Sequence, residues 1–241
     1  MKQYKKEKAF KWSDYYWYPT EQKGARIHPD KPLWWYDDTA IEVRDSNLVL
    51  KTQWNPKYFP ELDIQSLVGC GLVHSKKKFG YGTFEAEMKL PTGEYLWPAF
   101  WMYGYDRWPP EIDVMEGYSN RFGNYFKPKL FPFSLYKAET TIHYNDEDGN
   151  HQKTKSESPW IGLKAPNKHY IKYKVEWFPD RVTFYYDDKK VREITDKYIL
   201  EQLSYTKMHV LFNNGITDLK NYEEGPYSEF TIKYFKYTPY E

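Results

Sequence analysis

The residues of this chain whose types and spacing best suit chemistry lie in the segment WPPEIDVMEGY, residues 108–118. Three carboxylates, Glu111, Asp113 and Glu116, are separated there by apolar residues typical of a strand interior. Burying three like charges without a ligand would cost several kcal/mol in desolvation and repulsion. Such a group is therefore expected at a site where the acids carry out chemistry. The chemistry that suits it is glycosidic bond cleavage, which needs one ionised and one protonated carboxyl, because crowded like charges raise at least one pKa.

The geometry of this segment depends on how the strand is built. Regular alternation places Glu111 and Asp113 on one face and turns Glu116 to the other. A β-bulge near Val114 and Met115 adds one residue and returns Glu116 to the shared face. The two glutamates then lie roughly 13 Å apart at their Cα atoms, whereas a retaining glycosidase holds its carboxyl groups about 5–5.5 Å apart. The side chains must therefore lean together over a curved sheet, with Asp113 between them.

Two other interpretations of the three acids stay open on the residues alone. The first is a Ca²⁺ site, although this ion prefers loop oxygens and backbone carbonyls to the side chains of an apolar strand. The second is that the acids simply decorate a solvated strand edge. Catalysis is favoured over either of them.

The rest of the chain supplies strands that position this segment. In the segments 81–90 and 170–178, apolar and polar residues alternate, which predicts half-buried strands. Turn residues separate further short strands, and one short helix is expected near Asp196 to Leu203. This pattern predicts an all-β fold, an antiparallel β-sandwich. No repeat or linker is seen, so we expect a single domain over residues 1–241, in which residues 1–35 form an N-terminal strand and loop extension.

The composition narrows the classes of partner. Lys and Arg total 35 and Asp and Glu total 34, so the charge gives no reason to expect nucleic acid as a partner. Aromatic residues make up 20% of the chain, and their rings favour strands and stack on flat ligands such as sugars. Cys70 is the single cysteine, which excludes an internal disulfide and a cysteine zinc site. No segment has the apolar length of a signal peptide or a membrane span, so we expect a soluble chain without a membrane partner. A removed export signal stays open.

A family resemblance rests on the same acidic segment. PEIDVMEG, residues 110–117, resembles the E-x-D-x-x-E active-site strand of glycoside hydrolase family 16, which includes laminarinases, agarases and carrageenases. The similarity covers about residues 40–238 and continues through GLVHSKKKFGYGTFEAEMKLPTGEYLWPAFWMYG, YKVEWFPDRVTFYYDDKKV, MHVLFNNG and EFTIKYFKY. It implies a jelly roll with an open substrate cleft on the concave sheet and a retaining mechanism that needs no cofactor. Family members often hold a structural Ca²⁺ on the convex side, and no ligand set for one stands out here.

The resemblance also implies a role for each acid. Glu111 matches the nucleophile that forms the glycosyl-enzyme intermediate, and Glu116 matches the general acid and base. Asp113 matches the middle acid, which hydrogen-bonds the nucleophile and tunes the titration of the pair.

Several residues are candidates for substrate binding. Trp97 and Trp101 are four apart and share a strand face, so they are either core residues or platforms under sugar rings, and the family match favours platforms. Trp108 is a further platform candidate. The resemblance places His143 beside the acids and Asn213 facing the sugar.

Two less regular segments have open roles. In the N-terminal segment, Trp35 either forms a distal subsite with its neighbours Trp34, Arg26 and His28 or fixes the loop onto the sandwich. The long loop after the acidic strand is basic and carries Arg121, which would suit sulfate groups.

The predicted function is internal cleavage of a β-linked polysaccharide, most readily a β-1,3- or mixed-linkage β-1,3/1,4-glucan. One alternative is hydrolysis of a marine galactan such as agar, porphyran or carrageenan, which the basic loop favours. The alternative from another class is a non-catalytic carbohydrate-binding protein with the same fold. The resemblance further implies a secreted or cell-surface location, and we expect a monomer.

Overall fold

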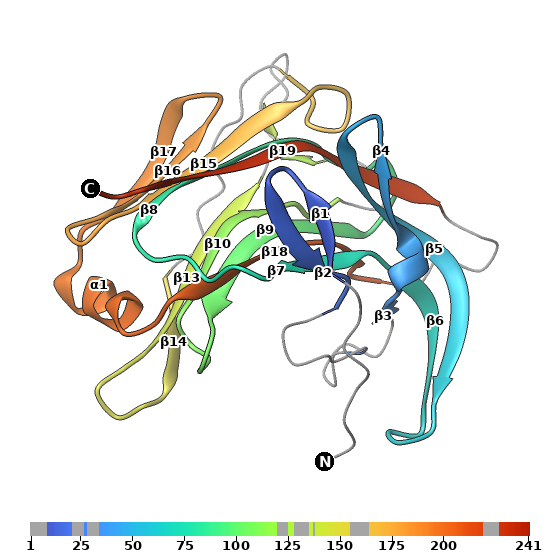
Figure 1. Cartoon of the computed structure of the whole chain (residues 1–241), viewed down its shortest axis with the longest axis horizontal. Helices are drawn as coiled ribbons and strands as arrows, with labels where there is room; N and C mark the ends of the chain where they lie inside the picture. The colour runs from blue at the N-terminus through green and yellow to red at the C-terminus, as the bar shows by residue number, and fades with distance from the viewer. Residues whose placement is uncertain are drawn as a thin grey trace.

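The structure is a computed structural model that describes residues 9–20, 27, 34–119, 125–127, 135–136, 138–154, 164–218 and 227–241. In this part of the chain two large β-sheets stack face to face, as Figure 1 shows. The predicted all-β sandwich is confirmed. Of the described strand pairs, all are antiparallel except one, β3 (Trp34–Tyr36) with β6 (Ile64–Cys70), which is parallel.

The first sheet has eight strands and contains the acidic segment. In spatial order its strands are β1 (Phe10–Trp12), β2 (Tyr15–Tyr18), β7 (Leu72–Ser75), β18 (Met208–Ile216), β9 (Leu96–Gly104), β10 (Glu111–Glu116), β13 (Glu139–Asn145) and β14 (His151–Lys153). The acidic strand β10 therefore lies between β9 and β13.

The second sheet has nine strands, eight along its main path and one beside it. They are β17 (Lys189–Ile194), β16 (Val182–Tyr186), β15 (Ile171–Trp177), β8 (Gly82–Lys89), β19 (Ser228–Pro239), β5 (Asn47–Phe59), β6 and β3, and β4 (Ile41–Arg44) pairs with β5. Outside both sheets lie the 3₁₀ helix η1 (Asp38–Ala40), the short pair β11 (Phe126–Lys127) and β12 (Leu135–Tyr136), and the helix α1 (Lys197–Ser204).

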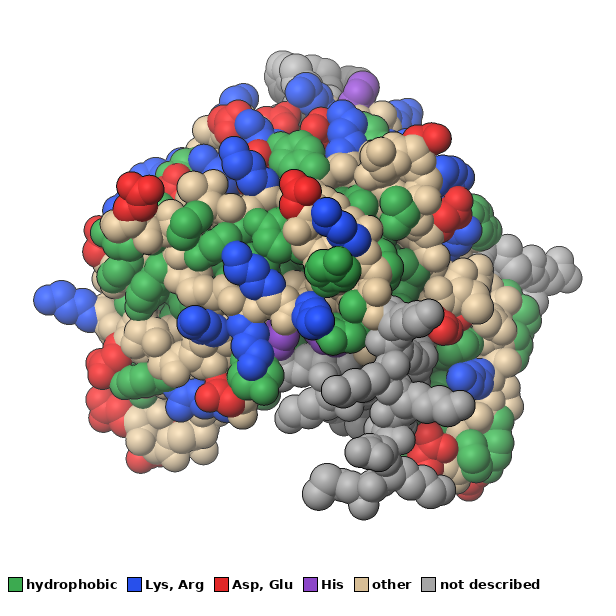
Figure 2. All heavy atoms as spheres, in the orientation of Figure 1, with side chains coloured by type: hydrophobic (Ala, Val, Ile, Leu, Met, Phe, Trp, Pro, Cys, Tyr) green, Lys and Arg blue, Asp and Glu red, His purple; other side chains and the backbone are tan. Residues whose placement is uncertain are grey.

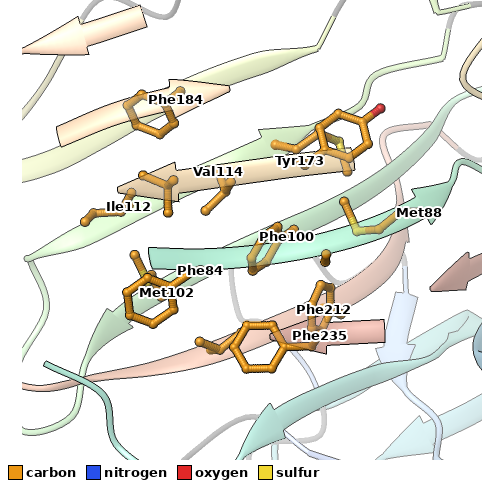
Figure 3. Close-up of a cluster of buried hydrophobic side chains, with 14 of the residues drawn as sticks. Phe84, Met88, Phe100, Met102, Ile112, Val114, Tyr173, Phe184, Phe212 and Phe235 are labelled. Atoms are coloured by element: carbon orange, nitrogen blue, oxygen red, sulfur yellow. The ribbon is translucent and has the colours of Figure 1, made fainter. Parts of the chain in front are cut away.

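The alternation read from the sequence is what joins the two sheets. On β8 the side chains of Phe84, Ala86 and Met88 are fully buried while their neighbours face outward. They meet apolar side chains of the eight-stranded sheet, and Figure 3 shows Ile112 and Val114 of β10 among them. Burial of each large apolar side chain stabilises the sandwich by about 1.5–3 kcal/mol. This packing fixes β10 against the core from one side only.

The predicted helix near Asp196 is confirmed as α1. Asp196 is its N-cap, and the carboxylate accepts a hydrogen bond from the Ile199 backbone N–H at 3.1 Å. Leu200 and Leu203 bury the inner face of the helix. No described helix is long and apolar enough to cross a membrane.

Two hairpins flank the face of the eight-stranded sheet that points away from the core. In Figure 1 the sheets curve in the same sense, with β10 on the inside of the curve, and the β5–β6 and β13–β14 hairpins project beyond it on either side. The face of β10 that does not pack on the core is thus the concave face of the sandwich. On the side of the molecule seen in Figure 2, basic and acidic side chains are intermixed, which agrees with the balanced charge of the chain.

Candidate active site

The predicted bulge is present in β10. Asp113 pairs with Trp101 of β9, and Met115 pairs with the next residue, Phe100, so two residues of β10 stand opposite one step of β9. The register with β13 shifts over the same stretch. Val114 and Met115 are both fully buried in the core between the sheets. Because two successive residues face inward, the alternation is reset, and the three acids share the concave face.

Glu116 is held by two donors at one oxygen. The Trp97 indole Nε1 donates to Glu116 Oε1 at 3.0 Å, and the Tyr118 hydroxyl donates to the same oxygen at 2.6 Å. The two donor rings stack with their centroids 5.6 Å apart. Burial and the charge of Glu116 raise the pKa of the Tyr118 phenol, so this hydroxyl keeps its proton and remains a donor. A proton carried by Glu116 therefore belongs on Oε2, the other oxygen of the carboxyl group.

Glu111 is held at the opposite end of the strand. The Trp108 indole Nε1 donates to Glu111 Oε2 at 2.6 Å, and His143 Nε2 lies 3.7 Å from Oε1. Burial and then the neighbouring charge of Asp113 raise the pKa of Glu111 well above its ordinary value, whereas His143 and the Trp108 hydrogen bond lower it. The Glu111 carboxyl group thus has a higher proton affinity than a solvated glutamate.

Asp113 lies between the two glutamates and is 3% exposed. His143 Nε2 lies 3.2 Å from Asp113 Oδ2, and His143 stands directly opposite Glu111 in the β10–β13 register. The predicted position of His143 beside the acids is therefore what the structure shows. Glu111 and Asp113 form a close acid pair, and the histidine ring faces both of them.

The metal interpretation is weakened by the donor set. Among the described residues, one group of three side chains has ligand atoms close enough to hold a cation, namely Glu111, Asp113 and His143, all within 4.8 Å of one another. A ring nitrogen in that set does not suit Ca²⁺, which takes oxygen ligands. In the part of the chain that the structure describes, no second group of three such side chains occurs.

The tryptophans of β9 share the concave face as predicted. Trp97 and Trp101 are partly exposed, and Trp101 stacks on Tyr103 with ring centroids 5.2 Å apart. Asn213 is 5% exposed, and its Oδ1 accepts a hydrogen bond from Trp101 Nε1 at 2.8 Å. The amide thus orients the Trp101 indole ring. Trp108 is 51% exposed although its indole N–H contacts Glu111, so a ring surface lies open beside the acids.

Trp35 requires a correction. It is 5% exposed and packs with Ile27 and Phe59 in a small cluster under the β5–β6 hairpin. Its Nε1 donates to the Asn55 carbonyl at 2.7 Å, and Lys57 Nζ lies 4.4 Å from the ring centroid. No ring face is left for a sugar, so the alternative holds, in which Trp35 fixes the N-terminal segment to the sandwich.

Other sequence predictions fall outside the described residues. These are Arg121 and most of the basic loop, together with Arg26 and His28. Their proposed contacts with substrate stay predictions.

Two residues of the site were not identified from the sequence. Tyr118 follows the acidic strand by two residues and had no recognisable pattern. His151 lies on β14, and its Nε2 is 2.8 Å from His143 Nδ1. The signal for His151 was the segment HYNDEDGNH, in which a turn with Gly149 folds the second histidine back beside the first.

Replacing Tyr118 with Phe tests the hydrogen bond that the Tyr118 hydroxyl donates to Glu116. A hydrogen bond to a charged group is worth about 1.5–3 kcal/mol, so we expect kcat/KM for polysaccharide to fall about 10- to 100-fold. The matched control is Tyr185→Phe, which removes a hydroxyl that donates to Glu176 at 2.9 Å on the other sheet. Equal rates for the two variants would show that Tyr118 does not position Glu116.

Replacing Glu111 with Gln tests the strain in the acid pair. The raised pKa means that folding stability contributed by Glu111 is complete below about 4.5, the ordinary value, and is lost as pH rises through the raised value. Gln keeps the neutral shape at every pH. Melting curves should therefore agree near pH 4, and near pH 8 the variant should melt about 2–4 °C higher.

The control for this stability change is Glu42→Gln. The Lys51 ammonium, 2.7 Å from Glu42, lowers the pKa of that carboxyl, which is the opposite perturbation. This variant should gain no stability at the higher pH. If Glu111→Gln also gains none, the acid pair is not strained.

Comparison with known proteins shows which family the chain matches. Residues 29–234 match the model of the family described as glycosyl hydrolases family 16. The chain is 26% identical over 195 residues to a glucan endo-1,3-beta-glucosidase A1 of Niallia circulans, covering 73% of this chain and 27% of that protein. It is 27% identical over 196 residues to a beta-glucanase of Rhodothermus marinus, covering 73% and 62% respectively. The chain thus spans between about a quarter and under two thirds of these relatives.

A solved structure supports the fold independently. The catalytic domain of an endo-1,3-beta-glucanase (laminarinase) from Thermotoga petrophila RKU-1 superposes with a TM-score of 0.68 at 20% identity. The alignment covers 87% of this chain and 84% of that domain.

Proposed function

Since this chain belongs to glycosyl hydrolases family 16, we propose that it is a retaining, endo-acting glycoside hydrolase of β-linked glucan. The observation that supports this proposal most is the bulge that brings Glu111 and Glu116 to one face of β10. A purely structural acidic strand would gain nothing from gathering three carboxylates on one partly exposed face. A glycosidase needs that arrangement, because two carboxyl groups must act on the same bond.

The first half of the reaction forms a covalent intermediate. Ionised Glu111 attacks the anomeric carbon of the sugar, and the bond from that carbon to the glycosidic oxygen breaks. Glu116 delivers the proton on Oε2 to the departing oxygen, so the leaving chain departs as a neutral alcohol. The Trp97 and Tyr118 donors then stabilise the carboxylate that remains. The sugar is now esterified to Glu111.

The second half releases the sugar with its original configuration. Glu116, now a carboxylate, takes a proton from water while the water oxygen attacks the anomeric carbon. The ester bond breaks, and Glu111 leaves as a carboxylate. Two inversions give net retention. Asp113 lies beside Glu111 with its Oδ2 3.2 Å from His143 Nε2, so the protonation of the two acids is coupled.

The substrate we propose is a β-1,3- or mixed-linkage β-1,3/1,4-glucan. The relatives named as glucanases support a glucan, and the partly exposed rings of Trp97, Trp101 and Trp108 offer stacking surfaces for neutral sugars along the concave face. The galactan alternative depends on Arg121 and its basic loop, which lie outside the described residues.

The proposal extends to where the protein works. A polysaccharide is too large to cross a membrane unaided, so we propose action outside the cell, as a monomer. Size measurement of the purified chain in solution checks the monomer.

Incubation with a panel of polysaccharides tests the function. The panel contains laminarin, mixed-linkage glucan, agarose, porphyran and carrageenans, and new reducing ends and product sizes are measured. We expect oligosaccharides of several lengths from laminarin or mixed-linkage glucan. Activity on a galactan alone would overturn the glucan and keep the mechanism. Sugar binding without any turnover would overturn the hydrolase in favour of a carbohydrate-binding protein.

A further inference from the structure

Two histidines form a pair at the edge of the candidate active site. His143 on β13 and His151 on β14 have nearly parallel ring planes, at 11°, with ring centroids 5.0 Å apart. His151 Nε2 lies 2.8 Å from His143 Nδ1, while the other nitrogen of His143 faces Asp113 at 3.2 Å. The Trp108 ring covers the pair, 4.7 Å from the His151 ring centroid. A continuous chain of polar contacts therefore runs from the buried acid pair to His151, which is exposed.

The chemistry of imidazole determines how this chain is ordered. A neutral imidazole has one N–H donor and one acceptor nitrogen. The side of His143 that faces the carboxylates is its donor, because a carboxylate only accepts, so the Nδ1 of His143 is the acceptor. The hydrogen between the two rings must then come from His151 Nε2. His151 thus donates to His143, whose Nε2–H is directed toward Asp113 Oδ2, 3.2 Å away.

The surroundings of His151 favour its neutral form, which has one N–H to donate. Burial, the neighbouring His143 and the Lys153 ammonium lower the pKa of His151. Lys153 stands opposite His143 in the β13–β14 register, while Glu111 and Asp113 approach His143 from β10. Near neutral pH His151 is therefore uncharged, with one nitrogen free to accept and one N–H to donate.

We propose that His151 is a positioning residue that holds the His143 ring so that its Nε2–H faces the Glu111–Asp113 pair. The inference rests on the proposed function only for its effect on rate. The ring directed at the acids lowers the pKa of Glu111, against the burial and the Asp113 charge that raise it, and so favours the ionised form that attacks. Loss of His151 leaves the His143 ring free to turn, which weakens that effect.

Three variants of the full chain separate ring packing from hydrogen bonding. His151→Phe keeps an aromatic ring against His143 and Trp108 but removes both nitrogens. His151→Gln restores an amide N–H near the position of Nε2. His169→Phe is the control, because His169 is an exposed histidine in the loop before β15.

The expected results cover structure and rate. In ¹⁵N spectra the wild type should show a coupling across the hydrogen bond between His151 Nε2 and His143 Nδ1, with His143 protonated at Nε2. His151→Phe should lose the coupling and lower kcat about tenfold. The acid limb of its pH profile of kcat/KM should move to higher pH by roughly half a pH unit to one pH unit. His151→Gln should restore most of the rate and the acid limb, and the control should match the wild type.

Two results would overturn the positioning role. One is a wild-type spectrum in which His143 carries its proton on Nδ1. The other is a pH profile that is the same for His151→Phe and wild type. If wild type cleaves no glycan, the proposed hydrolase fails, but the spectra still decide whether His151 holds His143.

Discussion

Glu111→Ala should lower polysaccharide hydrolysis by about 10⁴-fold or more, because it removes the atom that forms the covalent intermediate. Among the residues that the structure describes, no other carboxylate takes the same place: Asp113 lies deeper, at 3% exposure, and Glu116 is held at the other end of the strand by Trp97 and Tyr118. Reducing-end assays on laminarin and mixed-linkage glucan measure the loss. Glu87→Ala, which removes an acid paired with Lys233 on the opposite sheet, should leave the rate unchanged.

Added azide identifies the role of Glu111 in that variant. The anion fits the space vacated by the carboxylate and attacks the anomeric carbon from the same side. With an aryl β-glycoside as substrate, the product should be the α-glycosyl azide, formed by a single inversion. Recovery of a β-azide would mean that another residue still forms the intermediate, and the assignment of Glu111 would be wrong.

Glu116→Ala should lower polysaccharide hydrolysis by about 10²–10⁴-fold, the usual contribution of a positioned acid and base. The size of the loss should depend on the leaving group. A dinitrophenyl glycoside departs without a proton, so its first step should remain fast and produce a burst, after which the ester on Glu111 is hydrolysed slowly.

Azide again distinguishes the roles. In Glu116→Ala the anion attacks the intermediate instead of activated water, and the product should be the β-glycosyl azide. The paired outcomes, α from the Glu111 variant and β from the Glu116 variant, depend on one carboxyl at each end of the bulged strand. If Glu116→Ala loses its activity on the dinitrophenyl glycoside as completely as its activity on the polysaccharide, Glu116 is not the proton donor.

The sandwich was predictable because its core follows a local pattern. The strict alternation around Phe84 on β8, and the same alternation from Ile171 to Trp177 on β15, assign one face of each strand to the core. The bulge was predictable for a related reason. Val114 and Met115 are two adjacent apolar residues, and the acids on either side of them share a face only if both turn inward.

The remaining contacts depend on tertiary structure that no local pattern specifies. His151 reaches His143 because a hairpin turn sets the register of β14, and Tyr118 reaches Glu116 only after the chain has left the strand. Trp35 shows the opposite case. An aromatic side chain near the N-terminus has the same appearance in the sequence whether it binds sugar or packs against Phe59, and only burial distinguishes the two.

Trapping the covalent intermediate tests the central claim most directly. A 2-deoxy-2-fluoro β-glucoside or β-oligoglucoside with a dinitrophenyl leaving group should glycosylate the enzyme once as dinitrophenolate leaves, and mass spectrometry of its peptides should locate the sugar on Glu111. Glu116→Ala should still become labelled, because this leaving group needs no acid. If wild-type enzyme turns over glucan but acquires no label, or acquires it on a carboxylate outside the bulged strand, retaining catalysis by Glu111 and Glu116 is contradicted.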